Sequence, residues 1–365
     1  MKITCNKSDL LKGVNIALRA VPVRTTMEIL NCILFDCTEG EIKLTTNDME
    51  LGIETTVAGE VIENGRIALD AKFFSEIVRK LPDSEITIST DENFTAYISC
   101  EETEMEIPGR SGDDFSYLPY IERESSITVS DFTLKEVIRQ TLFSIDEAST
   151  NKVMTGELFE INGNNLKVVS LDRYRVSVRN VTLNDTYNPL KVIVPGKTLN
   201  ELSKILNGDA ESEVVIYFTT NHIMFLMENT LMVSRLIEGE YFKIDQMISR
   251  DYGTQININK KQILDCIDRA TLYVKEGNKK PVIFDIADGK MNVSITSPIG
   301  KMNAKLDIEK TGADVKIGFD PKFLIDALRV IDDENISIYF MNAKAPCTIK
   351  DEEGKYLYLI LPVNY

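Results

Sequence analysis

The sequence predicts an α+β protein made of three copies of one domain, each with two helices packed on antiparallel sheet. Two observations support this. Three helix-like segments, at residues 67–81, 192–206 and 317–331, resemble one another and follow at a constant interval of 125 residues. A repeat of this length is the size of a domain and is too long for a solenoid unit of roughly 20–50 residues.

The second observation is a strand-like block that repeats in step with those segments. Its three copies are ILFDCTEGEIKLTT, ELFEINGNNLKVVS and VIFDIADGKMNVSI, which align Phe35, Phe159 and Phe284. Shorter blocks (EITI, VVIYF and ISIYF) follow each helix-like segment. The chain of 365 residues is therefore expected to form domains at 1–122, 123–251 and 252–365.

Each copy opens with an amphipathic helix preceded by a residue that can cap it. The expected caps are Ser8, Ser130 and Asn259, because their side-chain oxygens can accept hydrogen bonds from the free amides of a first helical turn. Strands follow, and Asn162–Gly163 and Asp288–Gly289 predict hairpin turns because these residues tolerate positive φ. Polar segments at 120–126 and 248–255 mark the expected domain boundaries.

Composition narrows the class of protein. The formal net charge is −16, which argues against a simple nucleic-acid binder unless cations gather on one face. The N-terminal segment has no apolar run long enough for a signal peptide, no stretch is long enough for a membrane span, and the six cysteines form no CxxC pair. We expect a cytoplasmic protein with reduced thiols and no membrane partner.

Basic residues repeat on the predicted helices. In the second helix of each copy, basic residues stand seven positions apart, about two helical turns, so they share a face. The basic positions are Lys72, Arg79, Lys197, Lys204, Lys322 and Arg329 in the second helices, with Lys12, Arg19, Lys135, Arg139, Lys261 and Arg269 in the first. These helices could present cations to a polyanion. Alternatively, Glu76, Glu201 and Asp326, four residues after each lysine, could neutralise a solvated face.

Catalytic motifs are missing from the sequence. The single histidine, His222, excludes an HExxH site, and the cysteine spacing does not favour zinc. The pair Asp113–Asp114 and the run 332–334 could act as paired carboxylates or bind a metal, but a solvated loop also explains them. We expect no enzymatic activity, no cofactor and no metal.

Several motifs in register with the repeat resemble those of a known family. These are the opening MKIT, the segment VVSLDRYRVSV at 168–178, SRLIEGEYFKI at 234–244 and the terminal YLILPVNY. Over its whole length the chain resembles the bacterial DNA sliding clamp, the β subunit of DNA polymerase III. The resemblance implies three DNA-clamp domains per chain and a six-domain ring formed by a head-to-tail homodimer, with helices facing duplex DNA.

The resemblance also implies partners and sites. The implied partners are double-stranded DNA bound without sequence preference, the DNA polymerase III catalytic subunit, the clamp loader and other proteins with a clamp-binding motif. Arg24 corresponds to a DNA-contacting arginine, while Leu272 and Tyr273 would meet Met105 and Ile107 at the dimer interface. The implied peptide pocket comprises Met154, Leu171, Arg173, Tyr174, Arg175, Val176, Phe242, Met247, Leu359, Leu361, Pro362 and Val363.

This chain departs from the family pattern inside the pocket. Arg173 and Tyr174 stand where glycine and histidine are usual, and Phe242 stands where proline is usual. The family pattern therefore predicts the pocket but leaves its peptide preference open. Two alternatives to a DNA clamp also remain: a peptide-binding scaffold of the same repeats without DNA, and a hydrolase using Asp113 and Asp114.

Overall fold

The computed structural model describes residues 1–116, 118–248, 251–274 and 280–365. The predicted boundary segment 248–255 includes residues 249–250, which lie outside the described residues. By their internal contacts, the residues separate into two compact units: residues 1–134 with 197–236, and residues 135–196 with 237–365. The boundary between the units falls inside the middle repeat. Part of that repeat shares a sheet with the first repeat, and the rest shares a sheet with the third. Below, repeats 1, 2 and 3 denote residues 1–122, 123–251 and 252–365.

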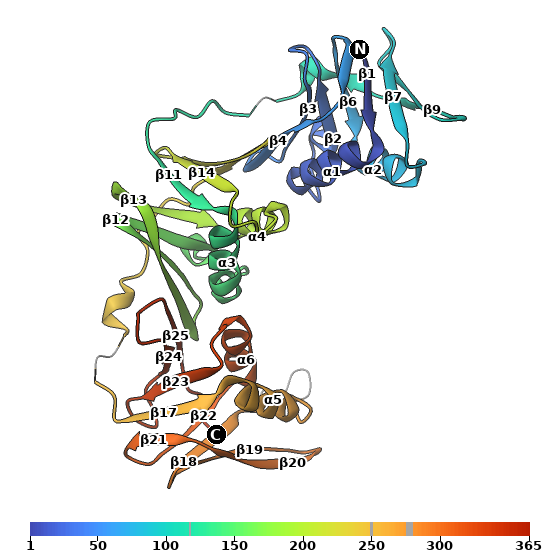
Figure 1. The fold of residues 1–365 in the computed structure, drawn as a ribbon. Coiled ribbons are helices and arrows are strands. Elements are labelled where there is room, and N and C mark those ends of the chain that lie inside the picture. Colours follow the sequence, from blue (N-terminus) through green and yellow to red (C-terminus); the bar gives the residue numbers. More distant parts are fainter. Residues whose placement is uncertain (117, 249–250, 275–279) are drawn as a thin grey trace. The chain divides into compact units, whose positions relative to one another are not determined.

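The described residues of repeat 1 form two α-helices and ten strands (Figure 1). Helices α1 and α2 span Lys7–Ala17 and Ala71–Lys80. The strands are β1 (Lys2–Asn6), β2 (Cys32–Asp36), β3 (Ile42–Asn47), β4 (Leu51–Val57), β5 (Glu60–Glu63), β6 (Arg66–Asp70), β7 (Glu85–Thr90), β8 (Thr95–Cys100), β9 (Thr103–Pro108) and β10 (Arg110–Ser111). The buried faces of both helices share one core with the strands beneath them, in which Phe35 packs edge-on against Phe74.

Repeat 2 contains helices α3 (Asp131–Thr141) and α4 (Gly196–Ile205). Its strands are β11 (Ser126–Ser130), β12 (Gly156–Leu171), β13 (Arg175–Pro195), β14 (Glu213–Phe218), β15 (His222–Met227) and β16 (Thr230–Arg235). The hairpin turn predicted at Asn162–Gly163 is wrong, because strand β12 runs through this position and pairs with β13 on both sides of it. The positive φ of Gly163, 62°, instead accompanies a shift of register in that pairing.

Repeat 3 contains helices α5 (Lys260–Thr271) and α6 (Pro321–Val330). Its strands are β17 (Thr254–Asn259), β18 (Val282–Ala287), β19 (Lys290–Ser297), β20 (Gly300–Asp307), β21 (Glu309–Gly312), β22 (Val315–Phe319), β23 (Asn335–Phe340), β24 (Cys347–Lys350) and β25 (Tyr356–Ile360). The predicted turn at Asp288–Gly289 is confirmed, since both residues have positive φ and Ala287 pairs with Lys290.

The strands of the described residues form four antiparallel sheets, two in each unit. The first unit has the orders β5-β1-β7-β8-β9 and β10-β6-β2-β3-β4-β16-β15-β14-β11. The second has β12-β13-β25-β24-β23-β17-β21 and β20-β19-β18-β22. The predicted class, α+β with helices on antiparallel sheet, is confirmed. Consecutive repeats are thus joined by strand pairing, β4 with β16 and β13 with β25.

Two of the three predicted caps are confirmed. The side chain of Ser130 accepts a hydrogen bond from Thr133 N at 3.2 Å, and that of Asn259 accepts from Gln262 N at 3.1 Å. The prediction for Ser8 is wrong, because α1 starts at Lys7, directly after β1, and Ser8 lies within its first turn. No helix of the described residues is long and apolar enough to cross a membrane.

Candidate functional site

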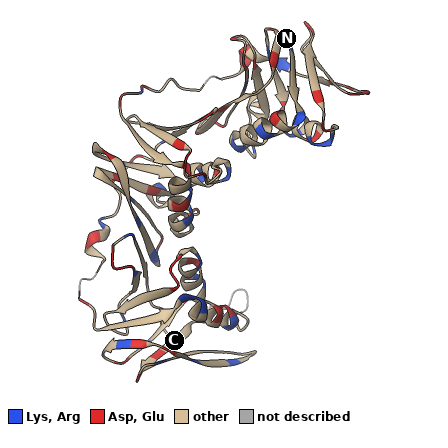
Figure 2. Cartoon of the chain, viewed as in Figure 1, with Lys and Arg blue, Asp and Glu red and all other residues tan. Residues whose placement is uncertain are grey.

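The predicted basic positions lie mainly on the exposed faces of the six α-helices in the described part of the chain (Figure 2). The thirteen candidate cations are exposed except Lys135, which is half-buried. Arg24 lies in the loop after α1 rather than on a helix. The amphipathic pattern therefore placed these side chains correctly at the surface. Their electrostatic state depends on neighbours that the helical pattern alone does not reveal.

The acidic residues of the second helices neutralise other cations than expected. Glu76 binds Arg79 at 2.7 Å and Glu201 binds Lys204 at 2.7 Å, three residues on in each case. The predicted pairing with the lysine four residues earlier does not form. In repeat 2, Lys197 instead pairs with Asp48 of repeat 1. Helical spacing permits either partner, and packing between repeats selects one.

Some of the candidate cations form ion pairs and others do not. Arg139 is held by Glu136 and by Asp332 at 3.1 Å, and Arg329 lies 3.4 Å from Asp268. Among the residues that the structure describes, six of these basic positions form no ion pair. They are Lys12, Arg24, Lys72, Lys261, Arg269 and Lys322. All six belong to repeats 1 and 3, so the available positive charge is concentrated there.

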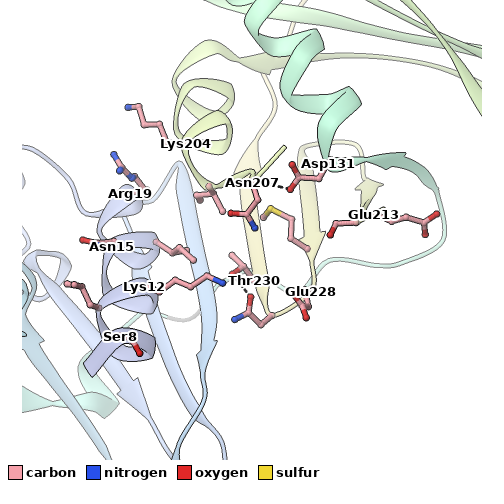
Figure 3. A pocket seen from close by; sticks show the side chains of 16 residues that line it. Ser8, Lys12, Asn15, Arg19, Asp131, Lys204, Asn207, Glu213, Glu228 and Thr230 are labelled. Atoms are coloured by element: carbon pink, nitrogen blue, oxygen red, sulfur yellow. Dashed lines mark hydrogen bonds between the residues drawn. The ribbon is translucent and has the colours of Figure 1, made fainter. Parts of the chain in front are cut away.

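A cleft of about 710 Å³ lies between α1 and α4, within the first unit. Figure 3 shows Arg19 and Lys204 extending on the same side of this cleft, while Lys12 points from α1 toward Thr230. Glu201 lies 3.6 Å from Arg19 and 2.7 Å from Lys204, so it links the two helices at the rim. The cleft thus brings three predicted cations together from two repeats.

An apolar surface lies on the other unit, where β13 pairs with β25. A cluster around Leu158, Val169, Leu171, Val176, Val178, Ile244 and Leu359 is bordered by Met154, Tyr241, Phe242, Ile248 and Leu357. Five of the twelve predicted pocket residues belong to this group. Met247 remains 48% exposed and Leu361 36% exposed, which leaves apolar surface open to a ligand.

The C-terminal residues are attached to repeat 2 and to the body of their own repeat 3. Leu361 N donates to Tyr174 O at 2.8 Å, and Val363 N donates to Gly318 O at 2.9 Å. Tyr174 in turn stacks on Phe323 of α6, with ring centroids 5.5 Å apart. The terminal segment therefore lies beside the apolar cluster as a fixed wall.

Arg175 plays a different part from the one suggested by its position in the pocket motif. Its side chain is buried, and its guanidinium donates to Asp172 at 3.0 Å, Asp326 at 2.6 Å and the Phe143 carbonyl at 2.5 Å. It also lies over the Phe323 ring at 4.8 Å. With these partners it joins repeat 2 to repeat 3 and has little capacity left for a peptide. Arg173, by contrast, is exposed at the pocket edge.

Tyr241, which the motifs did not identify, packs against the apolar cluster. Tyr241 lies 3.1 Å from the Val169 carbonyl through its hydroxyl, and its ring packs edge-on against Phe242. Burial raises the pKa of Tyr241, so its hydroxyl stays protonated and can donate. The sequence signal was the aromatic pair that follows EGE in the SRLIEGEYFKI motif.

The comparisons with known proteins agree across the full chain. Three family models match in order: the N-terminal domain of the DNA polymerase III β subunit at residues 1–119, its central domain at 128–243 and its C-terminal domain at 245–364. The β sliding clamps of Staphylococcus epidermidis and Staphylococcus aureus are 32% and 33% identical to this chain, covering 100% of it and 99% of each relative.

Solved structures give the same result. A putative DNA polymerase III β subunit from Eubacterium rectale superposes with a TM-score of 0.97 at 62% identity, covering 100% of both chains. The DNA polymerase sliding clamp of Bacillus subtilis has a TM-score of 0.97 at 32% identity, covering 100% of this chain and 99% of its own. The sequence motifs, the three-fold repeat and the backbone fold therefore all match the sliding clamp family.

Proposed function

Because the chain belongs to the DNA polymerase III β subunit family of bacterial sliding clamps, we propose that it acts as a processivity clamp that encircles duplex DNA. The observation that carries this proposal is the three-fold repeat, whose helices carry the exposed cations while its strands join one repeat to the next. In this role two copies close into a ring, and topology rather than tight binding retains the DNA. The protein itself catalyses no reaction.

DNA contact in such a ring involves phosphates and no base edges. Phosphate contacts are independent of sequence, which is what sliding requires. The cations without ion pairs, Lys12 and Arg24 among them, are the strongest candidates for these contacts. Paired cations such as Arg139 would have to give up a carboxylate first.

We expect Lys12→Ala and Arg24→Ala each to weaken binding to random duplexes and to flatten the log–log salt dependence by about one. Each substitution removes one cation that would otherwise release a counterion from DNA. Fluorescence anisotropy over a range of salt concentrations measures both effects. Arg139→Ala is the matched control and should change the slope less. A marked preference for one DNA sequence would contradict the proposal.

The dimer interface is proposed at Met105, Ile107, Leu272 and Tyr273. Leu272 directly follows α5 and has 75% of its surface exposed, so a second copy could bury it. Tyr273 packs against the core of repeat 3, while Met105 and Ile107 pack against that of repeat 1. Ile107 is already buried in its own repeat, so most of the gain comes from Leu272, and fully burying one exposed leucine stabilises a contact by about 1.5–3 kcal/mol.

Leu272→Asp is expected to convert the dimer into monomers, because a carboxylate would be transferred into an apolar contact. Light scattering at fixed protein concentration measures the mass. Asp268→Ala, an exposed position on the same helix, is the control and should stay dimeric. A dimeric Leu272→Asp protein would show that the interface lies elsewhere.

The apolar surface at the β13–β25 junction is proposed as the docking site for partner peptides, including segments of the polymerase and the clamp loader. Methionine and aliphatic side chains suit a surface that accepts several partners, since they repack easily. Retention on circular but not linear DNA would separate this clamp from a peptide scaffold that does not encircle DNA.

A further inference from the structure

A second cleft lies within the unit formed by residues 135–196 and 237–365, where repeat 2 meets repeat 3. Its volume is about 390 Å³, which falls in the range of small-molecule sites, roughly 300–1,000 Å³. The walls come from the ends of α3 and α6, from strand β13 and from the turn between β24 and β25. Below, this space is called the acidic cleft.

Carboxylates dominate the rim of the acidic cleft. Five acidic residues line it, against the two cations Arg179 and Lys355. The acidic residues are Asp332, Asp333, Asp351, Glu352 and Glu353. Glu353 already pairs with Lys355 at 2.5 Å, so Arg179 is the one cation among the described lining residues that forms no ion pair. The cleft therefore has an excess of negative charge that its own residues do not neutralise.

A buried amide with an unmet acceptor lines the same cleft. Gln140, near the end of α3, has only 5% of its surface exposed. Its Nε2 donates to Asp332 Oδ2 at 3.2 Å, which fixes the orientation of the amide because a carboxylate can only accept. The Oε1 atom is buried and has no hydrogen-bond partner. Buried polar atoms are rarely left without a partner, so this oxygen indicates a ligand that donates.

The hydroxyl donors of the cleft are already engaged. The Tyr358 hydroxyl donates to the backbone carbonyl of Gln140 at 3.1 Å, and the Tyr356 hydroxyl donates to Asp333 at 2.6 Å. Burial raises the pKa of both tyrosines, so both stay protonated and neutral. Their rings lie 5.6 Å apart and provide aromatic surface beside the carboxylates. The cleft thus offers acceptors and aromatic rings to a ligand, and hardly any free donors.

Asp332 demonstrates that this rim holds a cation. Its carboxylate accepts from the Arg139 guanidinium at 3.1 Å as well as from Gln140, and its side chain remains exposed. A carboxylate has about four acceptor positions, so Asp332 can accept from a further donor on its solvent side. A cation bound there would also reach the unmet oxygen of the amide that Asp332 holds.

The fold does not require these side chains. Helices α1 and α3 each have eleven residues, which aligns Gln140 with Ile16, and α4 and α6 each have ten, which aligns Asp332 with Asn207. Ile16 and Asn207 line the cleft between α1 and α4, where the helices contribute cations. The same place in the fold is therefore basic at one junction of repeats and acidic at the other.

An organic cation fits this cleft better than a metal ion. In the described part of the chain, no three acidic, histidine or cysteine side chains are arranged to hold a metal. Asp333 and Asp351 are also engaged by Tyr356, through its hydroxyl and through its backbone N at 3.1 Å. Carboxylates from two separate loops instead suit several ammonium groups on an alkyl chain. Each ammonium carries three donors and can also lie against an aromatic face.

We infer that the acidic cleft binds an organic cation with two or more primary ammonium groups. One ammonium donates to Gln140 Oε1 and Asp332, and another meets the acidic turn between β24 and β25. The ammonium groups come either from a free polyamine or from neighbouring lysine side chains of a protein. The cleft shares no residue with the apolar surface at the β13–β25 junction, and the inference does not depend on the proposed function.

Calorimetric titration of the full-length protein with spermidine tests the inference. We expect Gln140→Leu and Asp332→Asn each to weaken binding by about 10-fold, since each removes an acceptor of a charge-assisted hydrogen bond. Arg179→Gln should tighten binding by roughly twofold to threefold, because it removes a competing positive charge. Glu92→Gln is the matched control: it changes the net charge as Asp332→Asn does, at an exposed turn of repeat 1, and should bind normally.

A tetralysine peptide distinguishes the two sources of the ammonium groups. If the ligand is a free polyamine, spermidine binds more tightly than the peptide. If it is a protein segment, the peptide binds more tightly. In both cases the two probes compete for one site, and Gln140→Leu weakens both. Thermal unfolding without ligand checks the fold of this variant, and Asp332→Asn gives the same test from an exposed position.

General attraction to an acidic protein would give a different pattern. Equal effects of Asp332→Asn and Glu92→Gln, or no effect of Gln140→Leu, would overturn the inference. Tighter binding of Mg²⁺ alone than of spermidine, lost in Asp332→Asn, would also overturn it. Site-specific losses together with the gain in Arg179→Gln support it. None of these measurements involves DNA or the dimer, so either this inference or the proposed function can fail without the other.

Discussion

Replacing Glu157 with valine is expected to stabilise the protein by roughly 3 kcal/mol at pH 7. Glu157 is fully buried on β12, and neither carboxylate oxygen has a hydrogen-bond partner. The neighbouring Thr141 hydroxyl donates instead to the Val137 carbonyl at 2.7 Å. The aligned residues of the other repeats are Ile33 and Val282, both fully buried, so an aliphatic side chain fits this position.

The effect should depend on pH in a defined direction. Burial raises the pKa of Glu157 from 4.5 to about 8, so the folded protein holds a proton that the unfolded chain releases. The free energy of unfolding is therefore not reduced by the ionisation of Glu157 below pH 4.5, where the carboxyl is protonated in both the folded and the unfolded chain. It falls as pH rises toward 8, by up to about 1.4 kcal/mol per pH unit.

Denaturant unfolding at several pH values and one fixed protein concentration measures this slope. Glu157→Gln should remove the slope while keeping a buried polar group, and Glu157→Val should remove both the slope and the unpaired polar atoms. Glu160→Gln, on the same strand but partly exposed, is the control and should keep the wild-type profile. An unchanged slope in Glu157→Gln would mean that Glu157 is ionised in the folded state.

Deleting residues 361–365 is expected to reduce the affinity for partner peptides at least 100-fold, as loss of a central contact region does at other interfaces. The deletion removes the wall formed by Leu361, Pro362 and Val363, and with it the backbone bonds to Tyr174 and Gly318. The strand β25 stays, because its pairing with β13 and β24 ends at Ile360. Dimerisation and thermal stability should therefore change little.

Calorimetric titration with a short apolar peptide from the polymerase measures the loss. Tyr365→Ala is the matched control, since this residue is 61% exposed and contacts only Lys316 O and Gly318 through described interactions. It should bind the peptide normally. Unchanged affinity in the deletion would place the peptide site elsewhere, and loss of folding would assign these residues a structural role.

The repeat allowed much of the fold to be predicted, because each helix and its apolar face appear three times in register. One prediction failed because of the strand that precedes a helix, and another because of a contact between repeats. Ser8 fits the pattern of a cap, yet β1 runs straight into α1 and moves the start of the helix to Lys7. The partner of Lys197 is Asp48, 149 residues away, which no helical spacing reveals.

The pocket was predicted from its motif, but the motif did not reveal what each member does. Arg175 looks like a ligand-binding residue in sequence, and only the folded chain shows its guanidinium occupied by Asp172 and Asp326. The burial of Glu157 had a signal in the aligned Ile33 and Val282. The alignment with two aliphatic residues predicts a buried glutamate only when the structure shows that this position of β12 faces the core.

The attachment of Arg175 has a thermodynamic consequence for partner binding. Its bond to Asp326 and the stacking of Tyr174 on Phe323 hold repeat 2 and the α6 helix together before any peptide arrives. The entropy of ordering these walls is therefore lost during folding and not during association. A preorganised surface of this kind can bind a short flexible segment with few contacts, because only the peptide must be immobilised.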